Sequence, residues 1–313
     1  LQARFADRHL VLLSDGDRVV LQEGPEELEL PTADGRRYET LVIVDSEWLT
    51  TGTIEDDQGT RSFLLQGDRG EWRHHSAPGG RLQSRWGARP LVEAGRLRGL
   101  IWIEGASPST AGVRFSAWDG SLWTPPDWIS PPGSGSQLAA SLAALPDRRW
   151  LAIWTSFDGE DDEVLFSEWA DGAWTAPARV ADDNRVPDIT PALAPTYNGA
   201  VAAWSSYDGS DYRVRISTFV DGLWSLPQWL GEAGSVFPSF VFDGADERAD
   251  FELLCRPVST DAWSLVELDS TGSIRRRIAS SSGSRGRPIV RRSAAGDLHL
   301  EWPRLERLER QEP

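Results

Sequence analysis

The segment SAWDGSLWTPPDW at residues 116–128 decides the fold, because close copies of it follow along the chain. It recurs as SEWADGAWTAP at 167–177 and as STFVDGLWSLPQW at 217–229. Its central tryptophans, Trp123, Trp174 and Trp224, lie 51 and 50 residues apart. Weaker copies supply further turn glycines at Gly16, Gly70 and Gly272. A fixed period of this length is typical of repeat proteins, so we interpret the chain as six copies of one unit.

A second marker repeats with the same period, upstream of the first in each unit. Short apolar runs end at Gly52, Trp102, Trp154, Trp204, Cys255 and Trp302. Between the markers, Val214 and Ile216 alternate with arginines, as in a strand with one buried face. Asp-Gly between such runs is a strong hairpin signal. Each unit therefore predicts four short antiparallel strands, and six units predict an all-β, six-bladed β-propeller.

The blade boundaries follow from prolines near the start of each innermost strand. We assign five blades to residues 37–88, 89–136, 137–189, 190–236 and 237–286. Only two strands fit after Pro288, and His9–Leu13 and Arg18–Gln22 have the pattern of two more. We expect these N-terminal strands to pair in the last blade and close the ring, because closure protects strand edges. Residues 1–303 then form a single propeller domain, and residues 304–313 an exposed C-terminal tail.

Composition excludes several classes of protein. The 313 residues include 48 acids and 32 bases, all of them arginine, which gives a net charge of −16. Nucleic acid would meet a repulsive field, so it is not an expected partner. One cysteine excludes an internal disulfide framework and a Cys-rich metal site. No apolar stretch reaches the length of a transmembrane helix.

The repeat unit at 191–227, with its Asp208-Gly and Asp221-Gly turns, resembles the repeats of sialidase-like (BNR, Asp-box) propellers. The turn departs from that family's Ser-x-Asp-x-Gly-x-x-Trp motif, since Ser217 stands four residues before Asp221. In that family the Asp-box is a folding device opposite the active-site face. The resemblance implies the propeller fold, and the family's habit, together with the absent start methionine, favours an extracellular or periplasmic location.

The catalytic set of the sialidases is not recognisable in this chain. The resemblance would imply an early Arg-Ile-Pro segment, three arginines around a substrate carboxylate, and a tyrosine nucleophile activated by glutamate. The Arg-Ile-Pro segment is missing, and Tyr38, Tyr197, Tyr207 and Tyr212 are the only tyrosines. No catalytic residue is therefore predicted. A six-bladed fucose lectin is a looser resemblance, through its repeated Asp-Gly-x-Trp hairpins.

The recurring tryptophans could form a sugar-stacking row or could pack between blades. A residue that recurs at one repeat position is explained most simply by packing, so we expect the tryptophans to be structural. Cys255 falls in the same series and is expected to be buried rather than reactive.

Acidic residues gather in loops that should share one propeller face. Between the second and third strands of three blades the predicted acidic rim comprises Asp56, Asp57, Asp158, Asp161, Asp162, Asp208 and Asp211. Asp182, Asp183 and Asp188 follow in a loop that leads to the next blade. Such a face suits calcium or a basic partner, and it is equally a solvated, solubilising rim. No cofactor is predicted, because no twelve-residue calcium loop is present and the four histidines lack zinc-ligand spacing.

Three arginines stand at the starts of innermost strands in consecutive blades. Arg37, Arg89 and Arg287 would converge at the mouth of the central channel, where guanidinium groups suit a carboxylate or phosphate. Alternatively they pair with Glu39, Glu93 or the acidic rim. The expected function is that of a non-catalytic binding or scaffold propeller that engages a protein partner or glycan through its loop face. The alternative is a glycoside-acting enzyme, in the first place a glycoside hydrolase, or a glycan-binding lectin of the sialidase-like group.

Overall fold

The regular structure of the chain consists of antiparallel strands. The computed structural model describes residues 2–5, 8–15, 18–32, 36–56, 59–68, 70–80, 87–105, 107, 110–133, 135–230, 234–241, 251–257, 263–269, 271–279, 287–292 and 297–302. Within these ranges the chain forms strands and short 3-10 turns, with no α-helix. The described residues accordingly include no helix long and apolar enough to cross a membrane.

Six sheets occupy successive stretches of the chain, and each contains four or five strands. The first sheet contains β1 (Gln2–Phe5), β2 (Arg8–Asp15), β3 (Arg18–Glu23) and β4 (Glu26–Leu30). The second contains β5 (Arg37–Val44), β6 (Glu47–Asp56), β7 (Gly59–Asp68) and β8 (Glu71–His74). The third contains β9 (Arg89–Glu93), β10 (Arg96–Glu104), β11 (Gly112–Ala117) and β12 (Asp127–Ser130). The fourth contains β13 (Ser136–Ala144), β14 (Trp150–Phe157), β15 (Asp162–Ala170), β16 (Ala173–Trp174) and β17 (Ala178–Arg179). The fifth contains β18 (Asp188–Thr196), β19 (Gly199–Tyr207), β20 (Tyr212–Val220), β21 (Leu223–Trp224) and β22 (Gln228–Leu230). The sixth contains β23 (Ser235–Val241), β24 (Phe251–Pro257), β25 (Ser264–Leu268) and β26 (Ile274–Ala279).

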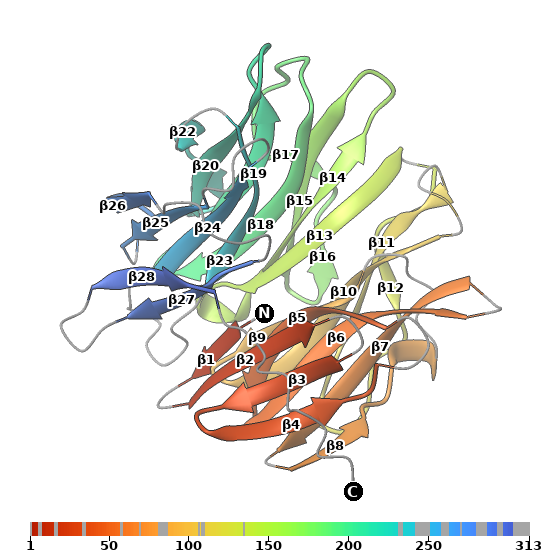
Figure 1. Cartoon of the computed structure of the whole chain (residues 1–313). Coiled ribbons are helices and arrows are strands. Elements are labelled where there is room, and N and C mark those ends of the chain that lie inside the picture. The colour runs from red at the N-terminus through yellow and green to blue at the C-terminus, as the bar shows by residue number, and fades with distance from the viewer. Residues whose placement is uncertain are drawn as a thin grey trace, which may run out of the picture.

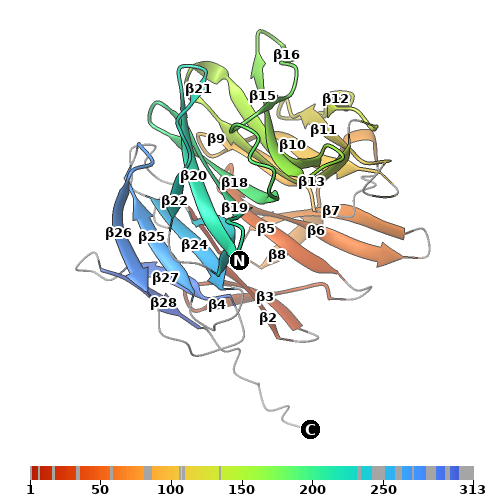
Figure 2. The same ribbon diagram turned by 90° about the horizontal axis from the view of Figure 1, so that it is seen from above.

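The sheets stand around a common axis, which Figure 2 shows from above. Their first strands are innermost, and neighbouring first strands contact one another around the axis. Five of these strands begin at Arg37, Arg89, Ser136, Asp188 and Ser235, within two residues of the predicted boundaries. The prediction of an all-β, six-bladed propeller with four-stranded antiparallel blades is confirmed.

The predicted closure of the ring is wrong in its details. The N-terminal strands β1 to β4 pair with one another in order and make a complete blade. Two strands in this blade escaped prediction because Gln2–Phe5 is short and Glu26–Leu30 lies in a weak copy of the repeat. The remaining strands, β27 (Ile289–Arg292) and β28 (Leu298–Glu301), form a separate two-stranded sheet. This sheet lies between the β23–β26 blade and the β1–β4 blade (Figures 1 and 2). The predicted tail at 304–313 lies outside the described residues.

The core lies between successive blades. Each apolar cluster joins two neighbouring sheets: Leu10 and Leu21 of the first blade pack with Trp48 and Phe63 of the second, for example. Val290 and Leu298 of the two-stranded sheet pack against Leu254 and Leu265 in the same way. Each blade is thus held by apolar side chains of its neighbours.

The tryptophan series occupies this core, as predicted. Trp102, Trp154 and Trp204 are almost fully buried, and Cys255 takes the equivalent place in the next blade. Burial raises the pKa of the Cys255 thiol to about 12, so the thiol stays protonated and unreactive. These residues are packing elements.

The repeated hairpin motif also acts as a structural device. The hydroxyls of Ser116, Ser167 and Ser217 donate to backbone carbonyls eight residues later, at 2.7, 2.7 and 2.8 Å. The turns at Asp171-Gly172 and Asp221-Gly222 have positive φ at both residues, as a two-residue hairpin requires. The tryptophans that follow pack on the preceding blade: Trp174 against Phe115, and Trp224 against Phe166. The motif therefore closes each hairpin and seats it on its neighbour.

We predict that Trp154→Ala will lower the free energy of unfolding by about 3 to 5 kcal/mol, because it opens a cavity between two blades. Trp154 is 0% exposed, whereas Trp72 is 37% exposed and serves as the matched control. Urea unfolding followed by circular dichroism measures both variants. Equal losses for the two would contradict the assignment of the core to the spaces between blades.

Candidate functional site

The charged residues singled out by sequence lie on one face of the propeller. In each blade the start of the innermost strand pairs with the end of the second strand, as Ser136 does with Phe157 and Asp188 with Ser206. The loops after the second strands therefore lie at the same edge as the strand starts. We call this face the loop face; it carries Arg89, Asp158 and Asp208.

Two acids of the predicted rim are turn-forming residues. Asp158 Oδ1 accepts the backbone N–H groups of Glu160 at 3.0 Å and Asp161 at 3.4 Å. Asp208 Oδ1 accepts those of Ser210 and Asp211, both at 2.9 Å. These hydrogen bonds stabilise the carboxylates and lower both pKa values, that of Asp208 to about 2. Both acids hold the bends between the second and third strands.

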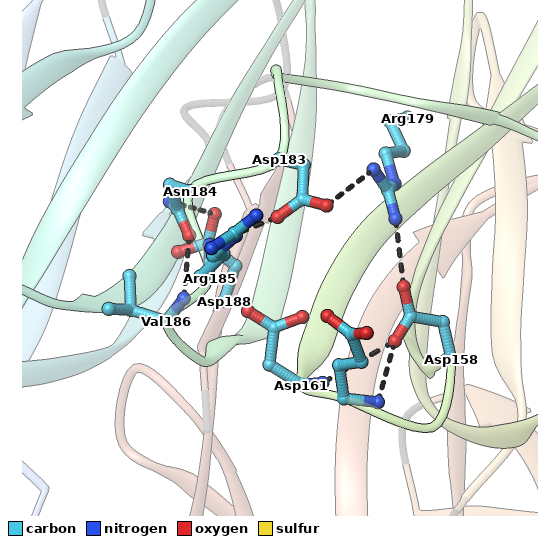
Figure 3. A network of polar contacts seen from close by, with 9 residues as sticks. Asp158, Asp161, Arg179, Asp183, Asn184, Arg185, Val186 and Asp188 are labelled. Atoms are coloured by element: carbon cyan, nitrogen blue, oxygen red, sulfur yellow. Dashed lines mark hydrogen bonds and ion pairs between the residues drawn. The ribbon is translucent and has the colours of Figure 1, made fainter.

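Three further acids converge beside the Asp158 turn. Asp161 directly precedes β15, and Glu163 is the second residue of that strand. Asp183 approaches from the loop between β17 and β18 (Figure 3). One carboxylate oxygen of each residue lies within 4.8 Å of the others. Asp161 is 8% exposed and Glu163 is 2% exposed.

Arg179 spans the outer side of this cluster. One of its terminal nitrogens lies 2.8 Å from Asp158 Oδ2 and the other 3.1 Å from Asp183 Oδ2. Figure 3 shows both carboxylates directed at the guanidinium group. Asp183 Oδ1 also accepts the backbone N–H of Arg185 at 3.0 Å. The ion pairs tie the loop before β18 to the bend before β15.

The buried acids resist ionisation. Burial is the main cause that raises the pKa of Glu163 to about 7; Arg179 opposes the shift, while Asp188 and Asp161 add to it. Burial and the neighbouring carboxylates of Asp183 and Asp158 also raise the pKa of Asp161. Such a group of oxygens can share protons or hold a cation.

The predicted acidic rim missed Glu163, although the repeat contained a signal for it. The β18–β22 blade follows with an offset of 50 residues, and there the position of Glu163 is taken by Arg213. Arg213 lies 3.1 Å from Asp208 and compensates its charge. A buried acid where the next blade has a base distinguishes the two blades.

A second exchange accompanies the first. In the β18–β22 blade Arg215 pairs in register with Trp229 and lies over its ring at 4.9 Å. At the equivalent positions here Leu165 pairs with Arg179. In the β18–β22 blade the arginine thus stands on the inner strand of the pair, whereas in the β13–β17 blade it stands on the outer strand, as Arg179, and contacts Asp158 and Asp183.

The other predicted rim residues do not join the cluster. Asp162 is the first residue of β15; burial, and after it the charge of Asp162, raises the pKa of Tyr212 in the next blade. Asp211 Oδ1 accepts the backbone N–H of Tyr212 at 2.8 Å. The side chain of Asp56 and the whole of Asp57 lie outside the described residues.

Two of the three predicted channel arginines lie near each other. Arg89 opens β9; it donates to the Glu39 carbonyl oxygen at 2.8 Å and lies 3.8 Å from the Glu39 carboxylate. Arg287 precedes β27 and donates to Ser239 Oγ at 2.7 Å. Burial, and after it the positive charge of Arg89, lowers the pKa of Arg287 to about 10. Arg37 opens β5 with an exposed side chain.

Comparisons with known proteins give the fold. No family model matches the chain, and no curated protein matches it. The chain is similar to a protein of unknown function from Dyadobacter fermentans, with a TM-score of 0.55, 11% identity, and coverage of 80% of this chain and 84% of that one. It is also similar to polysaccharide lyase Uly1, with a TM-score of 0.52, 9% identity, and coverage of 96% and 85%.

A GH62 α-L-arabinofuranosidase catalytic domain from Coprinopsis cinerea aligns with a TM-score of 0.45 and 14% identity, over 72% of this chain and 84% of that one. Identities this low establish a shared architecture rather than a shared activity.

We predict that Glu163→Gln will stabilise the protein at high pH in buffer containing EDTA. The folded pKa is about 7 against an ordinary 4.5, so stability present below pH 4.5 is lost as pH rises through 7. Removing the charge should restore on the order of 3 kcal/mol at pH 8 and almost nothing at pH 4. Thermal unfolding across this range measures the difference. A variant that is less stable than the parent at pH 8 would contradict the electrostatic interpretation.

Proposed function

We propose that this protein is a non-catalytic binding propeller that holds a carboxylate-bearing ligand at the mouth of its central channel. The observation that supports this best is that the positive charge of Arg89, in β9, adds to burial in lowering the pKa of Arg287, which precedes β27. Two like charges repel, so an anion placed between them would be favoured by both.

The environment of the two arginines leaves positive charge in excess. The Glu39 carboxylate accepts the Gly87 N–H at 2.8 Å and the Thr53 hydroxyl at 3.2 Å, which fixes it beside Arg89. The Ser239 hydroxyl beside Arg287 carries no charge. The side chain of Arg89 is 39% exposed, so solvent reaches its surface, while burial of the rest of the group lowers its pKa and Glu39 opposes that shift.

The chemistry of the arginines suits a planar anion. A guanidinium group binds a carboxylate through paired hydrogen bonds, and Arg37 at the neighbouring strand start offers a third cation. The net charge of −16 opposes a polyanion, so we favour a ligand with one or few carboxylates. An acidic glycan carries such groups, as does the C-terminus or an acidic side chain of a protein partner.

The resemblance of the hairpin repeats to sialidase-like propellers supports two finer parts of the proposal. The first is that the chain is a propeller of this type that lacks the family's catalytic set. The second is that it acts outside the cell or in the periplasm, where glycans and surface proteins are accessible.

A glycoside-acting enzyme is the second candidate, because the raised pKa of Glu163 is of the kind a general acid needs. The spacing of the acids argues against it. Glycosidase carboxyl groups flank the scissile bond at about 5 to 9.5 Å. Here the nearest oxygens of Asp161, Glu163 and Asp183 lie within 4.8 Å, and two of these residues are buried, so no sugar fits between them.

We predict that aryl sialosides, arabinosides and neutral glycosides will show no turnover above buffer. The expectation follows from the crowded acids, which leave no room for a substrate. Release of the chromogenic aglycone measures it, with Glu163→Gln as the control. If the parent hydrolyses a substrate with saturable kinetics and Glu163→Gln abolishes this hydrolysis, the enzyme becomes the favoured function.

We predict that digalacturonate, which carries two carboxylates, will bind and that Arg89→Ala and Arg287→Ala will each weaken binding by about ten- to a hundredfold, as expected for a charge-assisted hydrogen bond. Raising salt should weaken binding as well, because ions screen opposite charges over about 8 to 10 Å. Isothermal titration calorimetry measures both effects. Arg96→Ala is the matched control, since Arg96 is exposed at the opposite end of the same hairpin.

Two further ligands define the chemistry. A neutral galactan should not bind, and a short peptide with a free acidic C-terminus shows whether the carboxylate or the sugar is recognised. Equal binding of galactan and digalacturonate, or equal losses in Arg89→Ala and Arg96→Ala, would refute the proposal.

A further inference from the structure

The acids around β15 form an oxygen cage of the size a metal ion requires. Asp161, Glu163 and Asp183 each direct one carboxylate oxygen into a space where these atoms lie within 4.8 Å of one another. Two oxygens bound to one Ca²⁺ lie no more than about 5 Å apart, because each lies 2.3 to 2.6 Å from the ion.

An independent observation concerns the partners of these oxygens. Asp161 Oδ2 and Glu163 Oε1 are buried, and neither has a hydrogen-bond partner among the residues that the structure describes. Both residues are more than nine-tenths buried. A buried carboxylate oxygen without a partner is costly, so the two oxygens require a ligand.

The charges of the cluster call for a cation. Four carboxyl groups, those of Asp158, Asp161, Glu163 and Asp183, surround the guanidinium of Arg179, which forms ion pairs with only two of them. The two terminal nitrogens of Arg179 form ion pairs with Asp158 and Asp183. No ion pair therefore joins Arg179 directly to the unpartnered oxygens, although its charge still favours ionised Glu163.

The neighbouring blade provides an internal comparison. Its equivalent bend has the same turn, with Asp208 and Asp211 in the places of Asp158 and Asp161. There Arg213 replaces Glu163 and neutralises the turn from within. The β13–β17 blade exchanges that internal base for an acid.

We propose that Asp161, Glu163 and Asp183 bind one divalent cation of the calcium type. Carboxylate oxygens suit a hard cation, and Zn²⁺ would favour nitrogen or sulfur. Ca²⁺ fits the spacing better than Mg²⁺, whose ligands must approach to 2.0 to 2.1 Å. The ion would join the bend before β15 to the loop before β18 and so fix the loop face between two blades. This site is separate from Arg89 and does not rest on the proposed anion binding.

The test is calorimetric titration of EDTA-treated, dialysed protein with CaCl₂ at constant ionic strength. We expect about one ion per chain and a melting temperature that rises with added calcium. Glu163→Gln and Asp183→Asn should each weaken calcium binding at least tenfold. Asp211→Asn, at the equivalent bend of the next blade, should leave the affinity unchanged within twofold.

Folding of the variants is checked in EDTA by circular dichroism. Glu163→Gln should melt at or above the temperature of the metal-free parent at pH 8, which separates loss of a ligand from loss of structure. Asp183 is exposed, so Asp183→Asn tests the site without disturbing the core.

Several results would overturn the proposal. One is the absence of both heat and a melting shift at millimolar calcium. A second is unchanged binding by Glu163→Gln and Asp183→Asn, and a third is an equal loss in Asp211→Asn. Tighter binding of MgCl₂ than of CaCl₂ would overturn the assignment to a calcium-type ion.

Discussion

Apolar contact between neighbouring sheets is the interaction on which the rest of this structure depends. Each blade has apolar residues on both faces, so it is stable only when another sheet covers each of them. Two apolar clusters are examples of this cover: one packs Trp48 against the first blade, and the other packs Trp204 against the β13–β17 blade. Because the blades fix one another, the strand starts and second-strand loops are held at set distances around the axis. The charged residues of the loop face inherit their geometry from this packing.

The candidate sites arise where the repeat is broken. In a repeat protein the recurring residues serve the scaffold, and here the recurring serines, tryptophans and Asp-Gly turns all do so. Glu163 and Arg179 do not recur: the next blade has Arg213 and Trp229 in their places. In the next blade Arg213 forms an ion pair with the turn-forming Asp208. In the β13–β17 blade the two exchanges leave carboxylate oxygens of Asp161 and Glu163 without a partner among the described residues. Differences between the copies therefore carry more functional information than the motif they share.

The sequence was sufficient to predict the architecture because the two markers, Trp123–Trp174–Trp224 and Trp102–Trp154–Trp204, record the packing period directly. It was insufficient at the ring closure, since β1 spans only four residues and has no marker of its own. The acidic rim was predicted from loop positions, but its members separated into turn-forming acids such as Asp158 and a buried cluster at Asp161. That separation depends on which oxygen receives a backbone N–H, and composition does not encode it. The closeness of Arg89 and Arg287 likewise depends on the curvature of the ring.

The complete N-terminal blade has a consequence for how such a ring can change. Since β1 to β4 come from one continuous segment, the described strands of this blade borrow nothing from the other end of the chain. The β1–β4 sheet and the β27–β28 sheet therefore meet as two separate sheets, and neither contributes a described strand to the other. Duplication of a whole sheet next to that boundary would add a blade without rethreading any strand.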